Sequence, residues 1–128
     1  MKLILTILCG IIAFSSCSTS KQGLLGNDKD KHGCIASAGY TWSEVRKDCI
    51  RTFETGTRLN NAINPKATTA AFAVFSSDSS VTELFLPGSS HNPLLLKSGN
   101  NWKNKTFELK KVDGKLSLYK KGKLIYQE

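Results

Sequence analysis

Two serines and a histidine are the first combination of residues that could do chemistry. His91 directly follows Ser89 and Ser90 in a polar segment. An imidazole beside a hydroxyl can activate that hydroxyl as a nucleophile. A catalytic triad also needs a carboxylate that orients the histidine and an oxyanion hole, and the sequence marks neither. We therefore expect no nucleophilic catalysis at these residues.

Three carboxylates form a second combination. Glu54, Asp78 and Glu83 could supply the carboxyl pair of a glycosidase, whose two members flank the scissile bond. That chemistry needs a cleft, which a small tethered domain rarely builds. An enzyme is therefore the third hypothesis for this chain, and we expect a protein that is not an enzyme and has no catalytic residues.

A short acidic segment has the spacing of half a calcium loop. Asp28, Asp30 and His32 alternate with lysines, and Gly33 takes the place of the glycine at the sixth position. The twelfth position, where a bidentate glutamate belongs, is Gly39. We interpret this segment as a solvated linker and expect neither a metal nor another cofactor.

The N-terminal residues have the three-part layout of an export signal. Lys2 precedes an uncharged stretch over residues 3–14, and small residues then lead to Cys17. The stretch is shorter than the ~20 residues that a membrane-spanning helix needs. Residues 14–17, Phe-Ser-Ser-Cys, resemble a lipobox, which implies cleavage before Cys17 and lipidation of that cysteine. Simple secretion, with Cys17 free or discarded, is the alternative.

Cys34 and Cys49 remain once the signal and the lipid site are set aside. In the oxidising surroundings of an exported protein such a pair persists as a disulfide. Closing a loop of this size stabilises a small domain by about 3 kcal/mol. A pair of reactive or metal-binding thiols is the alternative, but the chain has only two histidines and completes no zinc site. We predict the Cys34–Cys49 disulfide.

Composition divides the chain into four parts. Residues 1–16 are the predicted signal peptide, and residues 17–33 are the lipidated cysteine with a polar, flexible tether. Residues 34–58 are predicted to form a knuckle closed by the disulfide. Residues 59–128 are predicted to form an antiparallel β domain, whose first segment, residues 59–69, has the composition of a loop.

The β domain has the pattern of short strands joined by tight turns. Phe107 and Leu109 alternate with Glu108 and Lys110. Asp113-Gly114 is a strong hairpin signal, and Lys121-Gly122 marks another turn. We predict a mainly β fold, an antiparallel meander that curls into a sheet or small barrel and so limits its exposed edges. The predicted strands cover residues 70–75, 81–86, 94–97, 102–112, 116–118 and 124–126.

The formal net charge of +8 is unevenly distributed. From residue 97 onward there are nine lysines against Glu108, Asp113 and Glu128. The solvated face of a sheet explains many such lysines, and an electrostatic partner would contact the same segment. Export excludes nucleic acid as the partner. The nine residues are Lys97, Lys103, Lys105, Lys110, Lys111, Lys115, Lys120, Lys121 and Lys123.

The stretches A-F-A-V-F-S-S-D-S-S-V-T-E-L-F-L-P-G (residues 71–88) and L-L-L-K-S-G-N-N-W (residues 94–102) resemble the membrane-bound C-type lysozyme inhibitor family. The resemblance implies a lipid-anchored, disulfide-bearing small β-barrel that inserts a loop into a muramidase cleft. It assigns the inhibitory roles to Lys97, Ser98, Trp102 and Lys103. The spacing is shorter than in the family, and the glycine that follows is Asn104 here.

Two functions follow from these observations. The first is a monomeric, non-catalytic binding module, lipid-anchored to a bacterial membrane, with the outer membrane favoured and the domain in the periplasm or at the cell surface. Its basic C-terminal β face would contact anionic envelope components. The alternative is a lysozyme inhibitor in which Lys103 meets the cleft carboxylates and Trp102 adds apolar contact. Long-range repulsion between two cationic proteins opposes that alternative.

Overall fold

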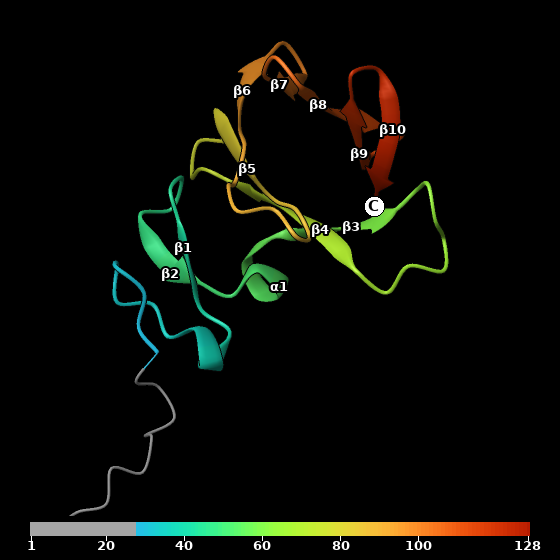
Figure 1. Cartoon of the computed structure of the whole chain (residues 1–128). Helices are drawn as coiled ribbons and strands as arrows, with labels where there is room; N and C mark the ends of the chain where they lie inside the picture. Colours follow the sequence, from blue (N-terminus) through green and yellow to red (C-terminus); the bar gives the residue numbers. More distant parts are fainter. Residues whose placement is uncertain (1–27) are drawn as a thin grey trace, which may run out of the picture.

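A closed antiparallel β-barrel forms the main part of the molecule in the computed structural model, which describes residues 28–128. Each of its eight strands pairs with the next along the chain, and β10 pairs back with β3 to close the barrel (Figure 1). The predicted mainly β, barrel-like fold with antiparallel strands is confirmed. The strands are β3 (Thr57–Asn61), β4 (Ala70–Phe75), β5 (Val81–Phe85), β6 (Leu94–Ser98), β7 (Asn101–Lys103), β8 (Phe107–Val112), β9 (Lys115–Lys120) and β10 (Lys123–Gln127).

The barrel core follows from the alternation of side chains along each strand. Ala71 and Ala73 on β4 are small and buried, which leaves room for larger side chains from the other strands. Complete burial of each leucine stabilises the fold by roughly 1.5–3 kcal/mol. The fully buried leucines come from β3, β5, β6, β8 and β9, and they are Leu59, Leu84, Leu95, Leu109 and Leu118.

Tight hairpins join the last three strands. Asp113 and Gly114 have φ angles of 51° and 79°, and Lys121 and Gly122 have φ angles of 48° and 81°. Positive φ at both central residues is the requirement of a turn whose twist matches that of its strands. The turns predicted at Asp113-Gly114 and Lys121-Gly122 are therefore confirmed. In each turn one of the two positions with positive φ is a glycine, which adopts this conformation without steric cost.

The knuckle is a small disulfide-closed unit ahead of the barrel. It contains η1 (Ala36–Ala38) and a hairpin of β1 (Thr41–Ser43) with β2 (Asp48–Ile50). The predicted disulfide is confirmed, with the Cα atoms of Cys34 and Cys49 5.4 Å apart. The ring of His32 stacks on Trp42 with a centroid distance of 4.1 Å.

A buried carboxylate joins the knuckle to the outside of the barrel. Glu83 on β5 is fully buried and accepts a hydrogen bond from the Ser43 hydroxyl at 2.7 Å. It also accepts bonds from the backbone N–H of Val45 at 3.4 Å and from the side-chain amide of Asn92 at 3.2 Å. Because a buried carboxylate without partners is costly, these bonds hold the two units in one arrangement.

The chain enters the barrel through a close approach at Gly56. This residue follows the short helix α1 (Thr52–Thr55) and precedes β3. A Cβ atom at Gly56 would lie 2.8 Å from the carbonyl oxygen of Thr52 and 3.1 Å from a methyl group of Val74. Only glycine fits there without movement of the backbone. No helix within residues 28–128 combines the length and the apolar character that a membrane crossing requires.

Three boundaries differ from the sequence predictions. Residues 59–61 were predicted to be loop but belong to β3, where Leu59 is fully buried and pairs with β4. The strand predicted over residues 102–112 is two strands, because the chain turns at residues 104–106. Residues 28–33, the described end of the predicted tether, are held to the knuckle by hydrogen bonds. Asp28 accepts from Ser37, and Asp30 accepts from Cys34.

Candidate functional site

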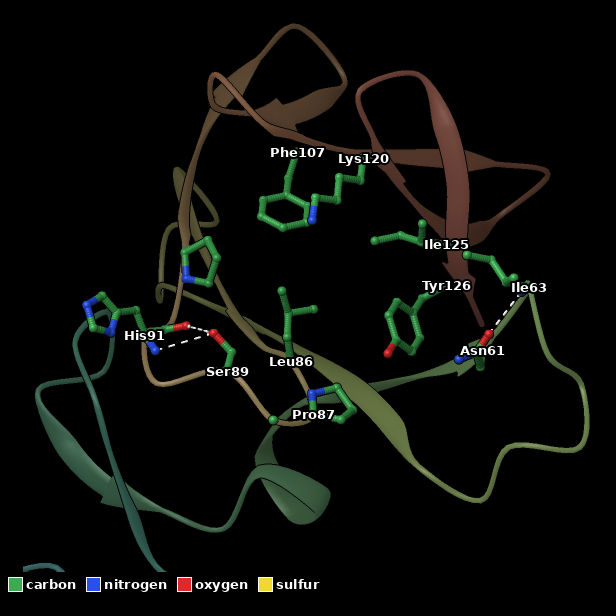
Figure 2. A pocket seen from close by; sticks show the side chains of 12 residues that line it. Asn61, Ile63, Leu86, Pro87, Ser89, His91, Phe107, Lys120, Ile125 and Tyr126 are labelled. Carbon is green, nitrogen blue, oxygen red and sulfur yellow. Dashed lines mark hydrogen bonds between the residues drawn. The ribbon is translucent and has the colours of Figure 1, made fainter.

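The barrel has two differently built ends. We call the end that carries the loops of residues 62–69, 87–93, 104–106 and 121–122 the open end. The opposite end, with the turns of residues 76–80, 99–100 and 113–114 and the C-terminal residue, is the closed end. Figure 2 shows the open end, where side chains from several loops and strands surround one space.

A cavity of about 590 Å³ lies at the open end. Eight-stranded barrels are just wide enough to be filled by side chains or to hold one small ligand, and ligand cavities measure about 300–1,000 Å³. Most of the lining is apolar. The lining residues are Asn61, Ile63, Leu86, Pro87, Gly88, Ser89, His91, Pro93, Phe107, Lys120, Ile125 and Tyr126.

Exposed lysines lie at one side of this cavity, and we call Lys105, Lys120, Lys121 and Lys123 the lysine rim. Lys120 lines the cavity and lies opposite Lys123 in the β9–β10 pairing. Lys121 donates its backbone N–H to the carbonyl oxygen of Thr106 at 3.0 Å, which brings the loop that carries Lys105 against the β9–β10 turn.

The rim has no acidic neighbours in the loops. None of the four open-end loops contains an aspartate or glutamate, and the first of them adds Lys66. The ion pairs found within residues 28–128 involve Lys47, Arg51 and Lys110, and none involves a lysine of the rim. The open end therefore carries an excess of positive charge beside an apolar cavity. Glu108, on β8, lines a small hollow with Lys105 and Lys121 but forms no ion pair with either.

The closed end is filled by an aromatic pair. Trp102 is buried, donates its indole N–H to the carbonyl oxygen of Ser79 at 2.7 Å, and meets Phe75 edge to face with a centroid distance of 4.9 Å. The remaining hollow measures about 330 Å³ and is lined by Lys111 and Glu128 among others. Charge here is mixed, because Asp78, Asp113 and Glu128 accompany Lys97, Lys111 and Lys115.

The four predicted binding residues do not form one exposed surface. Lys97, Ser98 and Trp102 lie toward the closed end, whereas Lys103 ends β7 and lines a small hollow with Lys105 and Lys121. Trp102 and Lys103 are consecutive on β7, so Trp102 points into the core and Lys103 points to solvent. The ammonium of Lys97 lies 5.9 Å from the centre of the Trp102 ring. Ser98 is exposed. Trp102 is thus a core residue and not the tip of a projecting loop.

The serine and histidine residues of the loop at 87–93 contact one another without forming a triad. The Ser90 hydroxyl lies 2.9 Å from Nδ1 of His91, and the Ser89 hydroxyl donates to the carbonyl oxygen of His91 at 2.6 Å. Both arrangements are local and exposed. Within residues 28–128 no carboxylate hydrogen-bonds to His91, so the orienting group of a triad is missing.

The three carboxylates that could have suggested a glycosidase have separate structural roles. Glu83 is buried beneath the knuckle, and Glu54 pairs with Arg51 at 3.2 Å. Hydrogen bonds from Ser80 and Ser76 lower the pKa of Asp78 from its ordinary 3.8 to about 2, so this carboxyl is a strong acceptor within its turn. None of the three lines the cavity at the open end.

The acidic segment with half a calcium loop is part of the knuckle. The hydroxyl and backbone N–H of Ser37 lower the pKa of Asp28, and the backbone N–H groups of Cys34 and His32 lower that of Asp30. Their oxygens are therefore used by the protein itself. Residues 28–128 contain no group of three or more histidine, cysteine or acidic side chains placed to hold a metal ion.

Sequence reasoning missed the cavity and most of its lining. Leu86, Ile125 and Tyr126 were read only as strand residues, and Phe107 as one position of an alternating pattern. The available signal was the absence of acidic residues from four loops that an antiparallel barrel brings to one end. Cys17, the predicted lipid site, lies outside the described residues.

Fold and site together define a class: a closed eight-stranded antiparallel barrel with a disulfide-closed knuckle and a cavity open at one end. Comparison of the chain with protein-family models, with curated proteins and with solved structures finds no match. The function must therefore be argued from the site alone.

Proposed function

We propose that this protein is a non-catalytic binding module of the bacterial cell envelope, anchored by a lipid on Cys17, that binds anionic envelope components through the lysine rim. The observation that carries the proposal is the charge of the open end. Its four loops contain no acidic residue, and the rim lysines form no ion pair with another described residue.

Charge of this kind acts at short range. At physiological ionic strength exposed charges are screened within about 8 Å, so the rim binds only an anion that it contacts closely. Each lysine near an anionic surface contributes about 1 kcal/mol to the free energy of binding to that surface. Two rim lysines together therefore change the affinity for an anionic surface by about thirtyfold.

The test compares two pairs of lysines at the two ends of the barrel. Residues 18–128 include the whole described fold and lack the proposed lipid site, so their binding to vesicles reports the domain itself. We expect Lys121→Gln with Lys123→Gln to weaken binding to anionic vesicles about thirtyfold. Lys111→Gln with Lys115→Gln removes the same charge at the closed end and is expected to change binding much less.

Three outcomes decide the proposal. Binding by the unaltered domain that falls steeply with added salt and is absent on neutral vesicles supports it. Equal losses from the two pairs would mean that net charge, not the rim, attracts the surface. No binding to anionic vesicles, to lipopolysaccharide or to wall polymer would remove the proposal.

Inhibition of a C-type lysozyme is the second candidate. It is supported by the sequence resemblance and by the exposure of Lys103 on β7. Trp102 is buried and cannot supply apolar contact to a cleft while the barrel is intact. We expect any inhibition to be lost in Lys103→Ala and kept in Lys121→Gln. An assay against several muramidases that finds no inhibition would exclude this candidate.

A further inference from the structure

We infer that the cavity at the open end binds a single-chain amphiphile, with its apolar chain inside the barrel mouth and its anionic head group at the lysine rim. This inference rests on the proposed function, because it names the class of anion that the rim binds. A free carboxylate with an alkyl chain and a single-chain lipid share this chemistry.

The lining of the cavity favours an apolar chain. Leu86, Phe107, Ile125 and Tyr126 come from three different strands or strand ends, and Figure 2 shows them around the same space. A volume of about 590 Å³ is equivalent to roughly twenty water molecules in the liquid. Water beside such walls is displaced favourably by an apolar group, since apolar surface then leaves water.

Lys120 lies where the head group of such a ligand would be. Its ammonium is 5.8 Å from the centre of the Phe107 ring, and the residue lines the cavity although it is exposed to solvent. Lys123 lies opposite it in the β9–β10 pairing, so two cations stand at one side of the mouth. Apolar walls and a cationic edge at a single opening match the two parts of an anionic amphiphile.

A polyanion without an alkyl chain would use only half of this site. It would bind the rim lysines and leave the apolar walls in contact with water. The closed end is a useful contrast, since its hollow is smaller and contains the carboxylate of Glu128 beside Lys111. Only the open end combines the larger apolar cavity with lysines that have no acidic partner among the described residues.

A chain-length series tests the inference. Titration calorimetry of residues 18–128 with octanoate, decanoate and dodecanoate, each below its micellar concentration, should show affinity rising about fourfold per added methylene. Dodecanol, which has the chain but no charge, should bind more weakly than dodecanoate. Binding that does not depend on chain length would overturn the inference.

Two variants locate the site. Leu86→Trp fills the mouth and should abolish dodecanoate binding, whereas Leu96→Trp, on the exposed outer face of β6, should leave it unchanged. Lys120→Gln should weaken dodecanoate binding about fivefold to tenfold while dodecanol binding stays the same. If Leu86→Trp does not fold, the Lys120→Gln variant tests the inference. Equal losses of affinity for dodecanoate and dodecanol in that variant would contradict the role of Lys120.

The results separate this inference from the proposed function. Binding to anionic vesicles without binding to any soluble alkyl carboxylate would leave the proposed function standing and exclude the cavity as a chain site. Absence of both would remove the two together. Binding of the soluble series, lost in Leu86→Trp, would support both.

Discussion

The two ends of the barrel differ in their connections, two of which are long loops at the open end, and in what fills them. At the closed end Trp102 and Phe75 pack against each other, and the indole N–H is satisfied by Ser79. At the open end no comparable aromatic pair fills the space, and a cavity of about 590 Å³ remains. The difference indicates that one end stabilises the fold while the other is available for binding.

The two ends also differ in their charged residues. Two carboxylates at the closed end accept hydrogen bonds, Asp78 from Ser76 and Ser80 and Glu128 from the backbone N–H of Leu116. The loops at the open end have no carboxylates at all. A protein under selection for stability alone would have no reason to gather unpaired lysines beside a cavity.

The largest effect that tests this comparison is expected in the core of the closed end. Trp102→Ala removes a buried aromatic side chain and should lower the free energy of unfolding by about 3–5 kcal/mol. Phe107→Ala enlarges a cavity that is already open and should lower the free energy of unfolding by only about 1 kcal/mol. Urea unfolding followed by circular dichroism measures both. Equal costs would mean that the two ends contribute alike to stability.

A smaller effect is expected at the C-terminal residue. The Glu128 carboxylate accepts the backbone N–H of Leu116 at 3.0 Å, and its own N–H donates to the carbonyl oxygen of Leu116 at 2.9 Å. Glu128→Ala should lower the free energy of unfolding by about 1 kcal/mol. Lys123→Ala, the control at the open end, should change it by less than about 0.5 kcal/mol. A larger cost for Lys123→Ala would reverse the comparison.

The smallest effect concerns the acid titration of Asp78. Its folded pKa of about 2 lies below the ordinary 3.8, so the ionised form is favoured by folding. The stabilisation is complete above the unfolded pKa and is lost as the pH falls through the folded value. Side-chain NMR should find the midpoint near 2, and Ser80→Ala should raise it. A midpoint near 3.8 would show that these hydrogen bonds are weak in solution.

Local patterns predicted much of the barrel. Alternation of Phe107 and Leu109 with charged residues, and the turn at Asp113-Gly114, are properties of short segments, and both were identified from the sequence. The strand β3 was missed because Leu59 is its one large apolar residue among arginine and asparagines. Its strand character comes from pairing with β4 and with β10, which lies more than sixty residues away.

The candidate site was harder to predict than the fold. Glu83 has the residue type of a catalytic acid, and only its contact with Ser43, forty positions earlier, identifies it as a buried link between two units. Trp102 has the residue type of a binding anchor, but its place on β7 puts it in the core. The cavity combines side chains from both halves of the barrel sequence, so no local pattern marks it.

Closure of the barrel by β3 and β10 has a practical consequence for handling the molecule. Thr57 and Glu128 line the hollow at the closed end, so the chain enters and leaves the barrel there, although Asn61 and Tyr126 line the cavity. A fluorophore or affinity tag joined after Glu128 would therefore be attached at the closed end and not at the loops around the mouth. Immobilisation through the C-terminus would leave the mouth accessible to the surrounding solution.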